Sequence, residues 1–154
     1  MKSRRGFSLI EVMTAVVVLA ILGLIAVPSY RNFVVTQRAR QASYDLMASL
    51  MFARSEAIKR NASVSIVSAA GGWSRGWVVS AGGASLRTQD PYASAVTISN
   101  SPALASITYS NDGRLSGGST DFTIASTDGT VQVPARCVHM QLGGLPTSTM
   151  GACC

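Results

Sequence analysis

The stretch FSLIEVMTAVVVLAILGLIAV, from Phe7 to Val27, is a long apolar run, and Glu11 is its single charged residue. A helix rises about 1.5 Å per residue, so a run of this length is able to cross a bilayer. A carboxylate in hydrocarbon costs about 2.5–3.5 kcal/mol on insertion scales, so Glu11 needs a partner or a purpose. Its placement predicts a protein that starts in a membrane and later enters a packed helical assembly.

Three other classes of N-terminal segment fit this stretch less well. A cleaved secretory signal has an apolar region of roughly 7–15 residues and an A-x-A-like site, and this run is longer and has no such site. A lipidated anchor needs a cysteine near the start, but the first cysteine is Cys137. A single-span anchor fits the length and the preceding cations, Lys2, Arg4 and Arg5, yet it leaves Glu11 unexplained.

The string RGFSLIEVMTAVVVLAILGLIAVPSY, which begins at Arg5, resembles the N-terminus of type IV pilins and of the pseudopilins of type II secretion. The resemblance implies that a prepilin peptidase cuts after Gly6 and that Phe7 is then N-methylated. It also implies that the Glu11 carboxylate pairs with the N-terminal amine of a neighbouring subunit. Removing one partner of a buried pair costs about 3–5 kcal/mol, so this pair would set the register of assembly.

The helix is expected to continue beyond the apolar run to about Arg60. Pro28 lacks a backbone donor and frees the carbonyl of Leu24, which predicts a kink at that point. Further on, apolar residues recur at spacings of four and three and so share one helix face: Val35, Ala39, Ala42, Leu46, Leu50, Ala53 and Ala57. We expect a sheet to pack on this face, and Asn61 to end the helix in a left-handed conformation.

From Ser63 onward the apolar period becomes two, which predicts an α+β fold with the long helix packed on an antiparallel β-sheet domain. With the resemblance above, the chain divides into a prepilin leader (1–6), a transmembrane and assembly helix (7–28), its amphipathic continuation (29–61) and a C-terminal β-sheet domain (62–154). A loop is expected from Ala81 to Ser94. The expected strands are Ser63–Val67, Trp73–Ser80, Val96–Ser99, Ser106–Ser110, Asp121–Ser126 and one or two within Val131–Leu142, interrupted at Pro134.

Three later motifs resemble the GspH/FimT family of minor pilins and minor pseudopilins: ARSEAIKRN at Ala53–Asn61, GGWSRGWVV at Gly71–Val79 and RCVHMQL at Arg136–Leu142. The resemblance implies a minor type IV pilin that primes pilus assembly at or near the filament tip, within a complex of minor pilins. The alternative is the matching minor pseudopilin of a type II secretion system. Implied partners are other minor pilins, the major pilin and the prepilin peptidase. The implied location is the inner membrane, crossed once with the C-terminal domain in the periplasm, and then the assembled pilus at the cell surface.

A DNA-binding role is the second alternative, because some members of that family bind DNA through a Gly-Arg-x-Arg turn. The equivalent stretch here, Gly143–Ser148, reads GGLPTS and has no arginine to neutralise phosphates. Without the three leader cations, 13 − 3 = 10 basic residues face 7 acidic ones, a net charge of +3. DNA is therefore not an expected partner, although four arginines could still converge: Arg75, Arg87, Arg114 and Arg136.

The resemblance places the C-terminal domain in an oxidising compartment, so we expect a disulfide between Cys137 and either Cys153 or Cys154. A loop of about 15 residues closed in this way contributes on the order of 3 kcal/mol. A zinc site formed by Cys137, His139, Cys153 and Cys154 is the rival, but vicinal cysteines rarely both chelate, and we expect no metal. With one histidine and scattered acids, the sequence suggests no catalytic group and no cofactor, and the chain is not expected to be an enzyme.

Overall fold

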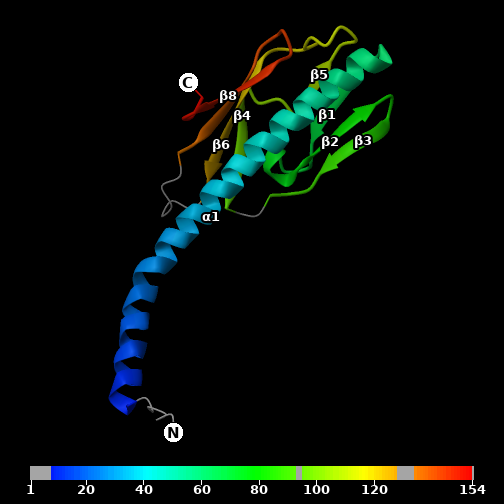
Figure 1. Cartoon of the computed structure of the whole chain (residues 1–154). Helices are drawn as coiled ribbons and strands as arrows, with labels where there is room; N and C mark the ends of the chain where they lie inside the picture. Colours follow the sequence, from blue (N-terminus) through cyan, green and yellow to red (C-terminus); the bar gives the residue numbers. More distant parts are fainter. Residues whose placement is uncertain (1–7, 93–94, 128–133, 154) are drawn as a thin grey trace.

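The computed structural model describes residues 8–92, 95–127 and 134–153, with one long helix and two four-stranded antiparallel sheets (Figure 1). The helix α1 spans Leu9–Arg60, and a short 3-10 helix, η1, spans Trp73–Arg75. One sheet has the order β3-β2-β1-β5 and the other the order β4-β6-β7-β8. The strands are β1 (Val64–Ser68), β2 (Trp77–Ala81), β3 (Ala84–Gln89), β4 (Val96–Ser101), β5 (Ser106–Tyr109), β6 (Thr120–Ser126), β7 (Arg136–Met140) and β8 (Pro146–Met150).

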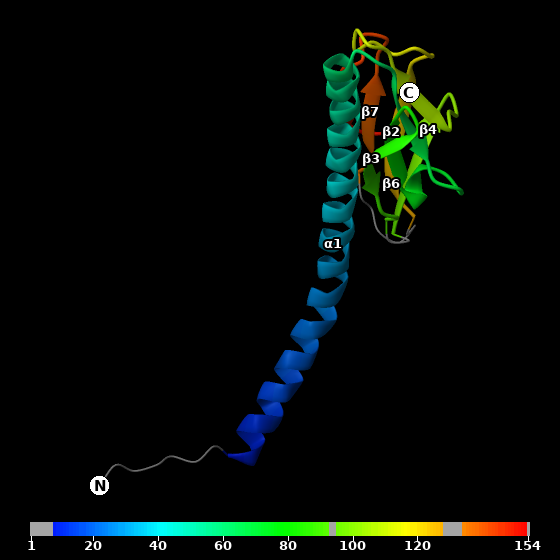
Figure 2. The same cartoon turned by 90° about the vertical axis from the view of Figure 1, so that its right-hand side faces the viewer.

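The two halves of the helix α1 lie in different surroundings. Figure 2 shows its first half extending away from the strands, while its second half lies against them. The helix continues through position 28, and the side chain of Pro28 lies outside the described residues, so the predicted kink stays a prediction. At the other end Asn61 has φ 49° and ψ 39°, the predicted left-handed stop. The N–H of Ala62 closes the turn by donating to the carbonyl of Ala57.

The second half of α1 packs its predicted apolar stripe on the two sheets. The stripe residues are buried, and from Ala42 to Ala57 none of them is exposed to solvent. They meet the inner faces of both sheets, including Val64 and Ile66 of β1 and Phe122 and Ile124 of β6. The predicted α+β architecture is therefore confirmed.

The strand predictions were wrong in three places, one of which is β8, a strand that was not predicted at all. The segment Ala81–Ser94 was expected to be a loop, but it contains β3, an edge strand whose side chains are mostly exposed and so lack an apolar alternation. The segment Trp73–Ser80 was expected to be one strand, but it is η1 followed by β2. Gly72 and Gly76, which flank η1, have φ values of 95° and 96°, a backbone region that a strand residue does not adopt.

Aromatic packing connects η1, which precedes β2 of one sheet, to β6 of the other sheet. The rings of Trp73 and Phe122 meet edge to face, with centroids 4.9 Å apart. Trp73 donates its indole N–H to the carbonyl of Leu104 at 2.9 Å. The hydroxyl of Ser74 accepts the backbone N–H of Ile98, which leaves this inner position of the edge strand β4 covered by η1. The segment GGWSRGWVV, which leads from β1 to β2 in one sheet, thus packs against β4 and β6 of the other sheet.

Candidate assembly interface

The first half of α1 presents apolar side chains on all sides. From Leu9 to Leu24 the large apolar residues are more than half exposed, and Leu9 is 78% exposed and Leu24 79% exposed. Within the described residues, α1 is the one helix that is long and apolar enough to cross a membrane. Apolar surface of this extent is unfavourable in water, so lipid or other protein must cover it.

Glu11 lies in the first turn of α1 and is the only charged residue between Leu9 and Leu24. The positive end of the helix dipole favours a carboxylate at this position. Thr14, the neighbouring polar residue, donates its hydroxyl to the carbonyls of Ile10 and Glu11 at 3.0 and 2.9 Å, so its hydrogen-bonding needs are met inside the helix. Glu11 is exposed and is the polar group in this apolar segment that is suited to contact another subunit. Gly6 and Phe7, the predicted cleavage and methylation residues, lie outside the described residues.

A disulfide joins Cys137 of β7 to Cys153 in the tail that follows β8, with the two Cα atoms 5.1 Å apart. The tail folds back over β6, where the N–H of Cys153 donates to the hydroxyl of Thr123 at 3.3 Å. Of the two pairings that the sequence left open, the structure has the one through Cys153, and Cys154 lies outside the described residues. In this oxidised form neither bonded sulfur is free to act as a thiolate ligand.

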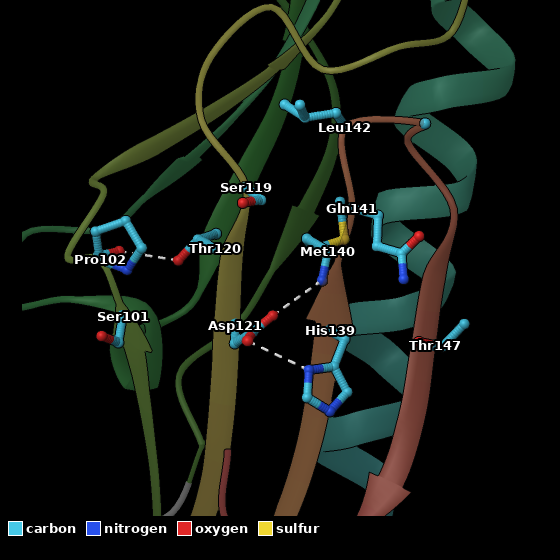
Figure 3. A pocket seen from close by; sticks show the side chains of 11 residues that line it. Ser101, Pro102, Ser119, Thr120, Asp121, His139, Met140, Gln141, Leu142 and Thr147 are labelled. Carbon is cyan, nitrogen blue, oxygen red and sulfur yellow. Dashed lines mark hydrogen bonds and ion pairs between the residues drawn. The ribbon is translucent and has the colours of Figure 1, made fainter. Parts of the chain in front are cut away.

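Sequence reasoning missed the partner of His139. His139 Nδ1 lies 3.2 Å from Asp121 Oδ2, because the two residues are directly opposite on β7 and β6. Asp121 Oδ1 also accepts the N–H of Met140 at 3.3 Å. The pair lies in an open cleft of about 750 Å³, also lined by Gln141 and Thr147 (Figure 3). Period-two alternation in DFTIAS puts Asp121 on the outer face, but only the strand register brings it to His139.

The four arginines considered for DNA binding lie on four separate elements. The Arg87 guanidinium of β3 lies 6.0 Å from the Phe52 ring centre, and the Arg136 guanidinium of β7 lies 5.9 Å from that of Tyr44. Figure 1 shows β3 and β8, one edge strand from each sheet, on opposite sides of α1. Arg75 belongs to η1, and Arg114 follows the turn that leaves β5. The stretch Gly143–Ser148 forms a turn and the start of β8.

Comparison with known proteins identifies the family. Residues 42–144 match the family described as type II transport protein GspH. The chain belongs to the GspH family. Residues 1–27 also match the prokaryotic N-terminal methylation motif, which implies processing by a prepilin peptidase. GspH-family proteins are structural and non-enzymatic, and membership implies partners in a pilus-like assembly. The apolar N-terminal helix is consistent with anchoring in the inner membrane before assembly.

Solved structures extend the comparison from the GspH family to a particular minor pilin. The chain is similar to the type IV minor pilin FimU of Pseudomonas aeruginosa strain PAO1, with 25% sequence identity and a TM-score of 0.61. The similarity covers 74% of this chain and 88% of that one. A second crystal form of the same minor pilin gives a TM-score of 0.58 at 25% identity, covering 72% and 90% of the two chains. The search of curated proteins gives no match.

Proposed function

We propose that this chain is a minor type IV pilin that primes pilus assembly and sits at or near the filament tip, as part of a complex of minor pilins. The observation that carries the proposal is the division of α1. One face of its second half is buried against the chain's own domain, whereas its first half is apolar and exposed. Lipid covers this first half before assembly, and the helices of neighbouring subunits cover it in the filament.

Glu11 aligns neighbouring helices when the first half of α1 moves from lipid into the filament. In the membrane an unpaired carboxylate is costly, and a cationic amine on a neighbouring subunit removes that cost. The similarity to FimU, which is a type IV minor pilin, supports the pilus over the other assemblies of this family. The separate positions of Arg75, Arg87, Arg114 and Arg136 give no support to a continuous phosphate-binding surface.

A minor pseudopilin of a type II secretion system is the second candidate, because the matching family is described as a type II transport protein. Deleting the gene distinguishes the two. If the chain is a minor pilin, the deletion strain loses surface pili and still secretes its type II substrates. Loss of secretion with normal pili would establish the pseudopilin instead.

The mature N-terminus provides the next prediction. Because residues 1–27 match a methylation motif, the mature chain should lack Met1–Gly6 and carry one methyl group on Phe7. Mass spectrometry of the membrane-extracted protein measures both changes. A strain without prepilin peptidase is the control and should retain the whole leader. An intact N-terminus in cells with active peptidase would mean that the apolar segment is an ordinary membrane anchor.

A further inference from the structure

The outer face of β6 and β7 gathers four side chains of the kinds that bind metal ions. His139 Nδ1 lies 3.2 Å from Asp121 Oδ2 and 3.6 Å from Cys137 Sγ. Cys153 Sγ is bonded to Cys137 Sγ, and both sulfurs lie within 4.8 Å of the imidazole. The ligand atoms of Cys137, His139 and Cys153 therefore form one cluster, and the Asp121 carboxylate lies beside its imidazole.

Strand geometry explains why these groups meet. Cys137 and His139 are two residues apart on β7, so they project from the same face of the sheet. Asp121 and Thr123 of β6 are their direct partners in the strand pairing. Cys153 is held above them by the hydroxyl of Thr123. Each of the four groups is thus positioned by backbone pairing or by a hydrogen bond from the fold.

Two of the distances between candidate ligands fit a tetrahedral zinc site. Bonds of about 2.3 Å to sulfur and 2.0–2.1 Å to nitrogen or oxygen place nitrogen and oxygen ligands about 3.3 Å apart, and nitrogen and sulfur ligands about 3.6 Å apart. The Asp121–His139 and Cys137–His139 distances are 3.2 and 3.6 Å. The two sulfurs must separate to about 3.8 Å for the same geometry. Cys153 lies beyond the end of β8, so its sulfur can shift without breaking a strand pair.

We propose that the reduced chain binds one Zn²⁺ ion through Cys137, Cys153, His139 and Asp121. Disulfide and zinc are alternative states, because both use the same two sulfurs. Reduction by a phosphine breaks the S–S bond with two electrons. The phosphine becomes its oxide with oxygen from water, and water also supplies the two thiol protons. Both protons leave when zinc binds, and the ion then holds the tail on β6 and β7 in place of the disulfide.

The groups around the cluster support the same assignment. His139 Nε2 lies 3.3 Å from Thr149 Oγ1, so a proton on Nε2 can be donated to that hydroxyl while Nδ1 faces the ion. The N–H of Met140 orients the Asp121 carboxylate. The side chains of His139 and Asp121 are 36% and 33% exposed in the open cleft of Figure 3, which gives the ion a path of entry. Sulfur ligands select zinc over magnesium or calcium.

Cobalt spectroscopy on the full-length chain in detergent tests the proposal. A Cys154→Ser background leaves the Cys137–Cys153 pair as the only disulfide. After reduction and removal of the phosphine, Co²⁺ should give the visible bands of tetrahedral cobalt and a sulfur-to-cobalt charge-transfer band at one ion per chain. Zn²⁺ should displace the cobalt and raise the thermal midpoint of the reduced chain. The oxidised chain should show none of these changes.

Matched variants identify the ligands. His139→Ala and Asp121→Ala should weaken binding by more than about 100-fold, since loss of an outer-shell partner alone costs roughly 10–100-fold. Thr147→Ala lines the same cleft without supplying a ligand and should bind normally. Circular dichroism of the oxidised variants, in which the disulfide is intact, checks their folding. An octahedral spectrum, equal binding by the oxidised chain, or unchanged affinity after either ligand substitution would overturn the proposal.

Discussion

Replacing Glu11 with alanine should leave the chain inserted and processed but reduce its incorporation into pili by at least about tenfold. In the proposed assembly the Glu11 carboxylate pairs with the N-terminal amine of a neighbour. Removing one partner of such a desolvated pair costs about 3–5 kcal/mol, because the remaining charge is left uncompensated. Quantitative immunoblotting of sheared pili against the membrane fraction measures the loss.

Glu56→Ala is the matched control, because it removes a carboxylate from the same helix at its other end. The Glu56 side chain is 12% exposed, but its partners Lys59 and Arg60 are 77% and 47% exposed and belong to the same helix, where such pairs contribute about 0.3–0.5 kcal/mol. This variant should enter pili normally. Glu11→Gln, which keeps the shape and loses the charge, should behave like Glu11→Ala. Normal recovery of Glu11→Ala in sheared pili would remove the assembly role of this residue.

Gly76→Ala should destabilise the C-terminal domain by about 3–5 kcal/mol. Gly76 has φ 96°, and an added Cβ would overlap the backbone carbonyl oxygen of Gln89, which cannot move without disturbing the pairing of β2 with β3. The backbone conformation and the overlap are both unfavourable. Thermal unfolding followed by circular dichroism measures the change.

Gly82→Ala separates these two effects. Gly82 has φ 55°, but no atom lies within 4 Å of the position that its Cβ would take. This control therefore carries the conformational cost alone, about 1 kcal/mol. Equal thermal midpoints for the two variants would show that the overlap of an added Cβ at Gly76 with Gln89 of β3 does not destabilise the domain.

The helix and its buried face follow directly from the sequence. The stripe from Val35 to Ala57 is periodic over several turns, and periodic patterns of this length specify both helix and core. The end of the helix at Asn61 is also predictable from local sequence, since few residue types adopt the left-handed conformation. These features depend on residues that are close in the sequence, so the sequence alone predicts them.

The sheet edges and the Asp121–His139 pair depend on contacts that a single sequence does not display. The strand β3 has no apolar alternation because it is an edge with little buried surface, and β8 is an edge strand of 5 residues that sequence analysis did not predict. Asp121 and His139 are 18 positions apart, and only the register of β6 with β7 brings them together. The pattern around η1 predicts a strand, but the positive φ values of Gly72 and Gly76 prevent a continuous strand there.

The location of the chain on isolated pili distinguishes a subunit at the filament tip from one along the filament. Antibodies against the C-terminal domain, visualised by immunogold electron microscopy on filaments from cells that express the chain at its natural level, report that location. A minor pilin that primes assembly should be labelled at one end of the filament, and the deletion strain should make few filaments. Labelling along the whole length, or normal numbers of filaments without the chain, would contradict the proposed role.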